Sequence, residues 1–224
     1  MTAIQWIKLL EYQFEKYNKR AFTITELAAL SGMSRASLHV KLNRFVKSGV
    51  FVRYIHGLYG LKKWPPEQII NYFDTDAYCT GHYALFKNGF ITQVPTTVTC
   101  FTNKRHMHSN RMPIESNAYI LEFVLPSIKI FDSSARPNAS PERAFCDFIF
   151  LCRDRGVTPD TFVTFRKLAS LDKNKIRGLL PNYPKTVQNE ALRILKELCT
   201  EGQVGVINAL NERPSLKQKR PISC

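Results

Sequence analysis

Long apolar runs and familiar catalytic motifs are both missing from this sequence. No stretch approaches the ~18 consecutive apolar residues typical of a membrane-spanning helix. Lys8, Glu11, Glu15 and Lys16 interrupt the N-terminal segment, which excludes the apolar core of a secretory signal peptide. P-loop, G-x-G-x-x-G and G-x-S-x-G motifs are also absent. We therefore expect a cytoplasmic protein that belongs to none of the enzyme classes marked by these motifs.

The cysteines give no sign of a disulfide framework or a metal site. There are six, none of them in a C-x-x-C pair, and most lie beside apolar residues, as Cys146 and Cys152 do. Cysteines in such surroundings are usually buried and reduced. Cys100 with His106 and His108 is a poor zinc candidate, because a single H-x-H lacks a second fixed pair of ligands. We expect neither a cofactor nor a metal.

Acidic residues in the middle of the chain leave a magnesium-dependent nuclease as one alternative. The candidates are Glu122, Asp132, Glu142 and Asp147. A restriction-type nuclease has an E-x-K motif on a strand, whereas Glu122 is followed by Phe123 and Val124. Glu142 fits better as an acid that favours the N-terminus of a helix. We predict no catalytic residue, and the nuclease alternative predicts cleavage that is lost when Asp132 or Glu142 is changed.

The distribution of charge indicates a polyanionic partner. The chain of 224 residues has a net charge of +14. Residues 1–63 contribute +8 and residues 164–224 contribute +7, while residues 64–163 contribute −1. Two basic ends therefore flank a nearly neutral centre, which favours at least one nucleic-acid-binding face.

The first 63 residues have the pattern of a winged helix-turn-helix domain. Apolar residues recur at helical spacing, Ser31-Gly32 and Gly49 provide stops, and His56-Gly57 indicates a hairpin turn. The predicted elements are a helix over Ala3–Lys16, a helix over Glu26–Leu30 capped by Thr25, a helix over Arg35–Ser48 capped by Ser34, and strands over Val50–Val52 and Leu58–Tyr59.

A second domain is expected after a linker that contains prolines. Pro65-Pro66 favours an extended chain, so we place a linker at residues 64–75 and an α+β domain with a helical tail at residues 76–224. The last ten residues look disordered. The elements predicted in this domain are helices over Tyr78–Asn88, Pro141–Arg153 and Val187–Leu198, and strands over Thr97–Thr102, Ala118–Leu125 and Ile128–Phe131.

The second helix of a helix-turn-helix enters the DNA major groove with its N-terminal residues at the base edges. Arg35 is suited to a guanine, and serines are suited to phosphate or sugar contacts. Basic residues further along the helix, and in the wing, are suited to phosphates or the minor groove. The predicted DNA-binding residues are Ser34, Arg35, Ser37, His39, Lys41, Asn43, Arg44, Lys47, Arg53 and His56.

Three segments in this order resemble the AbiEi-type antitoxins of bacterial toxin–antitoxin operons. They are the winged helix with Leu42–Gly49, the segment Tyr78–Val98 with its Gln93-Val94-Pro95, and the helix start Ser140–Asp147. The resemblance covers roughly residues 22–150. Arg143 stands where the family usually has Lys, and the recognition helix begins a turn earlier than in many relatives.

This resemblance implies two roles for the protein. The N-terminal domain is expected to repress its own operon by binding inverted repeats in double-stranded DNA near the promoter. The C-terminal domain is expected to counteract a nucleotidyltransferase-like toxin, and members of the family are usually described as lacking a stable complex with it. The Gln93–Pro95 and Pro141–Asp147 motifs are interpreted as structural. The alternative is a stand-alone winged-helix transcriptional regulator with a ligand- or protein-binding C-terminal domain and no toxin gene beside it.

Overall fold

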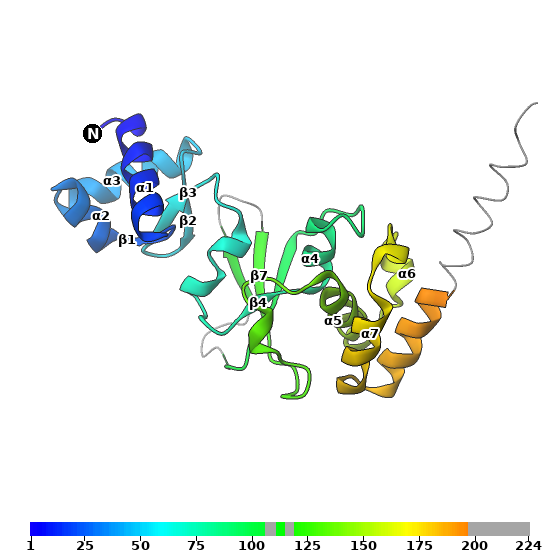
Figure 1. Cartoon of the computed structure of the whole chain (residues 1–224). Coiled ribbons are helices and arrows are strands. Elements are labelled where there is room, and N and C mark those ends of the chain that lie inside the picture. Colours follow the sequence, from blue (N-terminus) through cyan, green and yellow to red (C-terminus); the bar gives the residue numbers. More distant parts are fainter. Residues whose placement is uncertain (106–110, 115–118, 197–224) are drawn as a thin grey trace, which may run out of the picture.

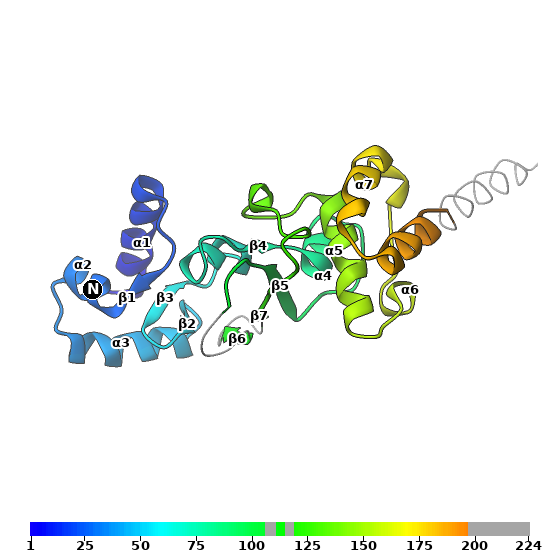
Figure 2. The same cartoon turned by 90° about the horizontal axis from the view of Figure 1, so that it is seen from below.

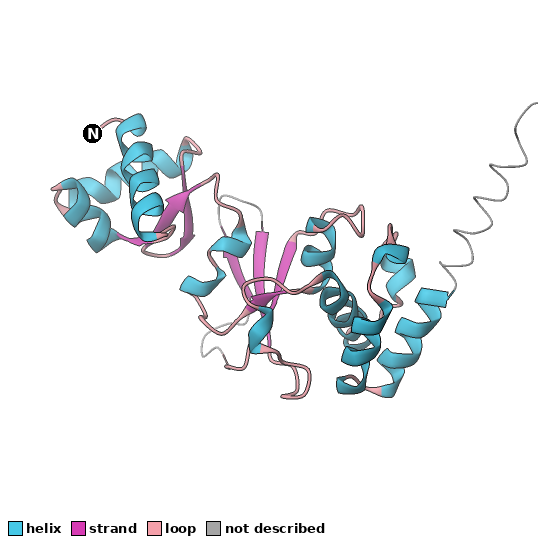
Figure 3. Cartoon of the chain, viewed as in Figure 1, coloured by secondary structure: helices cyan, strands magenta, loops and turns pink. Residues whose placement is uncertain are grey.

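The chain folds into an N-terminal winged helix-turn-helix followed by a mixed sheet and C-terminal helices (Figures 1 and 3). The computed structural model describes residues 1–105, 111–114 and 119–196. Figures 1 and 2 show the N-terminal helices at one end, the larger sheet in the middle, and helices α5 and α7 at the other end. The predicted α+β class is confirmed.

The winged unit is built from three helices and a small antiparallel sheet. The helices are α1 (Ala3–Tyr17), α2 (Ile24–Ser31) and α3 (Arg35–Lys47). The strands β1 (Phe22–Thr23), β2 (Phe51–Ile55) and β3 (Leu58–Leu61) pair in the order β1-β3-β2. Trp6, Leu10, Leu27, Leu38 and Leu42 are fully buried in the core of this unit.

The cap of α2 differs from the prediction. Helix α2 begins at Ile24, and its N-cap is Thr23, whose hydroxyl accepts a hydrogen bond from the Glu26 backbone N–H. The Glu26 carboxylate accepts in return from the Thr23 backbone N–H at 2.9 Å. The prediction of Thr25 as the cap is wrong, because only Thr23 has a glutamate three residues later to complete this reciprocal box. Ser34 caps α3 as predicted.

The second unit has a four-stranded mixed sheet. Strands β4 (Tyr78–Cys79), β5 (Thr97–Phe101), β7 (Tyr119–Val124) and β6 (Arg111–Ile114) are adjacent in that order, and β5 and β7 are parallel. The helices of this unit are α4 (Gly81–Lys87), α5 (Pro141–Asp154), α6 (Pro159–Phe162) and α7 (Lys173–Leu179), followed by a helix over residues 185–196.

One prediction for this unit is wrong in part and another is wrong. Tyr78 and Cys79 begin no helix, because they pair with Phe101 and Cys100 as an edge strand of the sheet. The strand predicted over Ile128–Phe131 is a turn, in which the backbone N–H groups of Ile130 and Phe131 both donate to the Ser127 carbonyl. Local β-propensity was the only support for that strand, and tertiary context overrides such a preference.

The segment predicted as an extended linker is folded. Pro66–Gln68 and Ile70–Tyr72 each form a 3-10 turn. Trp64 is buried in the core of the winged unit, whereas Ile69 and Ile70 are buried in the core of the second unit. The expected extended conformation is therefore wrong, because this segment carries apolar side chains that two cores take up. Figures 1 and 2 place the two turns between the winged unit and the larger sheet.

Strand β2 contributes side chains to both cores. Successive side chains of a strand point to opposite faces. Phe51 packs against the helices of the winged unit, while Val52 and Tyr54 belong to the core of the second unit. Gly60, paired with Val52, permits this contact, because an added Cβ would lie 2.5 Å from the Tyr54 hydroxyl oxygen. The wing sheet is therefore packed on both faces.

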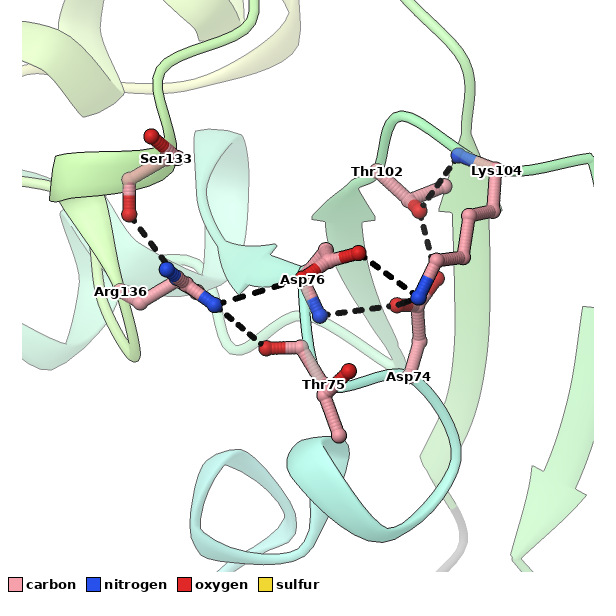
Figure 4. A network of polar contacts seen from close by, with 7 residues as sticks. All are labelled: Asp74, Thr75, Asp76, Thr102, Lys104, Ser133 and Arg136. Atoms are coloured by element: carbon pink, nitrogen blue, oxygen red, sulfur yellow. Dashed lines mark hydrogen bonds and ion pairs between the residues drawn. The ribbon is translucent and has the colours of Figure 1, made fainter.

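A polar network fixes the segment that leads into β4 (Figure 4). The Lys104 ammonium lies 2.7 Å from an Asp76 carboxylate oxygen, and Arg136 lies 3.4 Å from the other oxygen of the same carboxylate. The buried Asp74 accepts hydrogen bonds from the Thr102 hydroxyl and, at 2.9 Å, from the Asp76 backbone N–H. These bonds connect the chain after the 3-10 turns to the end of β5.

Cys79, Cys100, Cys146 and Cys152 are buried free thiols, as predicted. Cys199, Cys224, His106, His108 and the predicted disordered C-terminus lie outside the described residues. Across residues 1–105, 111–114 and 119–196, no helix is long and apolar enough to span a bilayer.

Candidate nucleic-acid interface

Helix α3 buries one face and presents the other to solvent. Leu38 and Leu42, one turn apart, are fully buried, and Phe45 and Val46 pack against the same core. Residues spaced three and four positions apart share a face of a helix. The opposite face is formed by five exposed residues: Ala36, Ser37, Val40, Arg44 and Lys47. Figure 2 shows α3 along the lower edge of the winged unit, with α1 above it.

Two apolar residues of this face, Ala36 and Val40, are not among the predicted DNA-binding residues, and Val40 is the larger. Its side chain is 54% exposed, and it lies one turn before Arg44. From sequence alone, the adjacent Val40 and Lys41 do not show which face of the helix is buried. The structure separates them, because Lys41 is half-buried and close enough to the Met1 amino group to lower the pKa of that group.

The first turn of α3 is held by local hydrogen bonds. The Ser34 Oγ accepts from the Ser37 backbone N–H at 3.3 Å, and the two serine hydroxyls are 3.0 Å apart. The exposed Arg35 donates from Nη2 to the Thr25 hydroxyl at 3.0 Å. The Arg35 guanidinium is therefore held at the first turn of α2.

In the middle of α3, Asn43 Nδ2 lies 3.3 Å from His39 Nδ1. These two residues are one turn apart, and this contact fixes their side chains relative to each other. The wing carries the other two predicted residues. Arg53 is half-buried on β2 opposite Tyr59, and His56 is exposed in the β2–β3 turn. Gly57, with φ of +81°, allows this tight turn.

The structure thus gathers Ser37, Arg44 and Lys47 on one exposed face and places Arg35 and Lys41 at its flanks. These side chains include the chemical groups that a recognition helix uses to contact DNA. It offers hydroxyl and cationic groups for phosphates together with an apolar side chain for base edges.

The four acidic residues of the nuclease alternative are engaged in contacts within the protein, and Asp132 and Asp147 share Arg143. Glu122 pairs with Arg155, Asp132 with Arg143, and Glu142 accepts from the Asp172 backbone N–H at 3.3 Å. Within the described part of the chain, no three His, Cys, Asp or Glu residues form a group that could hold a metal ion.

Asp147 is fully buried in a network of hydroxyl groups. The Thr80 hydroxyl donates to it at 2.6 Å, the Tyr183 hydroxyl donates to its other oxygen, and Arg143 Nε lies 3.8 Å away. Burial raises the pKa of Asp147 to about 6, although the hydroxyl groups and Arg143 act in the opposite direction. These contacts join helix α5 to the start of α4 and to residue 183.

Gln93 joins two segments that are far apart in sequence. Its Oε1 accepts from the Thr164 backbone N–H at 3.1 Å, and its Nε2 lies 3.3 Å from the Thr164 hydroxyl. The neighbouring Val94 is 67% exposed.

Most of the winged unit matches a known protein family. Residues 13–62 match the model of a family described as the AbiEi antitoxin transcriptional regulator. This segment is an AbiEi antitoxin-type regulator domain. The AbiEi-type domain contains α2, α3 and the wing, so it includes every residue of the predicted interface. The matched family is one of antitoxins and transcriptional regulators, and its members are typically non-enzymatic.

The fold of the whole chain also has a match among solved structures. The crystal structure of the RV2827C protein from Mycobacterium tuberculosis superposes with a TM-score of 0.52 at 15% sequence identity. The alignment covers 86% of this chain and 76% of that one, so the shared fold extends over parts of both units. No curated protein matches the sequence.

Proposed function

We propose that this protein is an antitoxin and a DNA-binding autorepressor of its own toxin–antitoxin operon, with α3 as the recognition helix. The observation that carries the proposal is the exposed face of α3, where Ser37, Val40, Arg44 and Lys47 lie opposite a fully buried leucine pair. The domain around it contributes +8 of the net charge. A basic domain with such an unburied helix face is suited to the major groove.

Residues of this face, of its flanks and of the wing have different proposed roles in recognition. Val40 is placed for apolar contact with a thymine methyl group, and Asn43, oriented by His39, for the donor and acceptor pair of adenine. Arg35 reaches a guanine from the flank if it exchanges its bond to Thr25 for the base. Ser34, Ser37, Arg44 and Lys47, with Lys41 at the flank and Arg53 and His56 in the wing, contact the phosphate backbone.

The operator is proposed to consist of inverted repeats at the protein's own promoter. Each half-site takes one copy of the AbiEi-type domain, so two copies bind each operator. The exposed cations Arg166, Lys167, Lys173, Lys175 and Arg177 in the second unit add a further backbone surface. A protein truncated after about residue 163 that stays folded and keeps its affinity and salt dependence would exclude this additional surface.

The antitoxin role is supported by the family to which the winged unit belongs. We propose that the toxin is nucleotidyltransferase-like and that it is counteracted without a stable complex. A growth assay in which the adjacent nucleotidyltransferase gene is toxic alone and harmless together with this protein would support this role. If no such gene lies beside this one, the protein is a stand-alone regulator instead.

The DNA-binding proposal is tested by titrating the full-length protein on its upstream DNA and on a scrambled duplex at two salt concentrations. Tight, selective and salt-sensitive binding supports it. Arg44→Ala should weaken binding to both duplexes and reduce the salt slope by about 1. Arg35→Ala should cost about 1–3 kcal/mol on the upstream DNA and little on the scrambled duplex.

Lys8→Ala is the matched control, because it removes one exposed charge from α1 and leaves the face of α3 intact. Weak binding that is equal on both duplexes would refute the autorepressor. Equal losses for Arg44→Ala and Lys8→Ala would show that binding is not centred on α3.

A further inference from the structure

A cavity of about 350 Å³ lies in the second unit. Residues from α4, α5, α6 and the loop before β5 line it, among them His82, Val94, Pro95, Phe148 and Phe162. Its volume is within the range of small-molecule sites, which are concave, mostly apolar and equipped with few polar groups. Val94 and Pro95 therefore form part of the cavity wall. The hydrogen bonds of the adjacent Gln93 connect that wall to Thr164, which follows α6.

His82 is the polar group that distinguishes this cavity. Its ring contacts Phe148 and Phe162, with centroid distances of 5.9 and 5.4 Å. Among the residues that the structure describes, its buried Nε2 has no hydrogen-bonding partner. Buried polar atoms are nearly always paired, so a lone one beside a cavity indicates a group that is supplied from outside the chain.

The protonation state and tautomer of the His82 imidazole determine which hydrogen-bonding group can pair with Nε2. Burial lowers the pKa of His82, although a hydrogen bond with the Gln93 backbone acts in the opposite direction. The ring is therefore neutral near pH 7. Because Nε2 has no partner, the bond to the Gln93 backbone carbonyl uses Nδ1–H. A neutral ring with its proton on Nδ1 has a lone pair on Nε2, and the missing partner is a hydrogen-bond donor.

The remaining lining disfavours a charged ligand. Arg155 is the cation among the lining residues, and its guanidinium already pairs with Glu122. The aromatic rings of Phe148 and Phe162 instead suit a flat apolar body. Nε2 is shielded from solvent, so a ligand that donates to it has to displace a neighbouring side chain. The Phe162 ring is 50% exposed and lies in the four-residue helix α6.

We propose that this cavity binds a small, uncharged, planar molecule whose hydroxyl or N–H group donates a hydrogen bond to His82 Nε2. The site is separate from the α3 face, and the proposal does not depend on DNA binding.

Calorimetric titration of the full-length protein with 2-naphthol tests the proposal, with 2-methylnaphthalene and 2-naphthoate as matched probes. The methyl compound has nearly the same shape but cannot donate. We expect 2-naphthol to bind at least about tenfold more tightly than 2-methylnaphthalene, because only the hydroxyl pairs the buried nitrogen. The carboxylate should bind more weakly than 2-naphthol. No detectable binding of 2-naphthol, or equal affinity for the two uncharged probes, would overturn the proposal.

Two variants locate the binding site. His82→Phe keeps an aromatic ring and should reduce the affinity for 2-naphthol to that for 2-methylnaphthalene. Val94→Trp adds bulk at an exposed lining position, so it should fold normally and lose both ligands. Ile128→Trp adds bulk at an exposed apolar position outside the cavity lining and should leave both affinities unchanged. Binding that survives Val94→Trp would place the ligand elsewhere and refute the proposal.

Discussion

Replacing Asp147 by Asn should change how the stability of this protein depends on pH. Asp147 is fully buried, and it faces the Thr80 and Tyr183 hydroxyl groups and the Arg143 guanidinium. Tyr78 also lies close enough to affect its pKa. The carboxyl group keeps its proton in the folded protein up to about pH 6, compared with an ordinary pKa of 3.8. An asparagine at this position has no proton to lose.

The size of the effect follows from the two pKa values. Between pH 3.8 and about 6, the folded protein holds a proton on Asp147 that the unfolded chain has lost. The free energy of unfolding therefore decreases as the pH rises through this window. At about 1.4 kcal/mol for each pKa unit, the total change approaches about 3 kcal/mol. The difference in stability between wild type and Asp147→Asn should fall by this amount between about pH 4 and pH 7.

Urea denaturation of both proteins at several pH values measures this difference directly. Asp132→Asn is the control, because hydrogen bonds from Ser134 lower the pKa of Asp132. The contribution of Asp132 to stability is present above its ordinary pKa and is lost in acid, so its pH dependence has the opposite sign. A difference between wild type and Asp147→Asn that stays constant from pH 4 to 7 would refute the reasoning, because Asp147 would then titrate as it does in the unfolded chain.

Four further substitutions test packing, a helix cap and a buried hydrogen bond by urea denaturation. Gly60→Ala should destabilise the protein by about 1–3 kcal/mol, because the added Cβ would overlap a tyrosine hydroxyl and a backbone carbonyl. Gly178→Ala is the control: the space around this α7 residue is open, so the change should be neutral or stabilise by up to about 1 kcal/mol. Equal effects of the two substitutions would contradict the reasoning. Thr23→Ala should cost about 1 kcal/mol through loss of the α2 cap, and an unchanged midpoint would show that the cap contributes nothing. Tyr83→Phe removes the 2.6 Å hydrogen bond to the buried Glu67 in the first 3-10 turn and should cost about 1–3 kcal/mol. Glu67 also pairs with Lys87, and a neutral result would mean that this pair alone satisfies the Glu67 carboxylate.

Local sequence signals were sufficient for most of the winged unit. Ser34 before an apolar periodic stretch, and glycines after each of two helices, determine helix ends through hydrogen bonds within a few residues. The Pro141 helix start has the same local origin. The resemblance to AbiEi-type antitoxins likewise depended on ordered local motifs, and the family match to residues 13–62 confirms it for the winged unit.

Contacts between distant segments were decided by the tertiary structure. Tyr78 and Cys79 form a strand because β5 lies beside them, and the residues after Trp64 fold because two cores receive their apolar side chains. The exposure of Val40 also depended on how α3 packs, since its apolar character alone favoured burial.

The sequence by itself determined the α+β class, the helix-turn-helix and the basic charge of the chain, because caps, periodicity and charge act over short distances along the chain. Only the tertiary structure decided which face of α3 is exposed and how the wing joins the second unit. It also decided that His82, Val94 and Phe162 enclose a cavity. These features arise where residues far apart in sequence exclude water together, and no local pattern specifies which residues will meet.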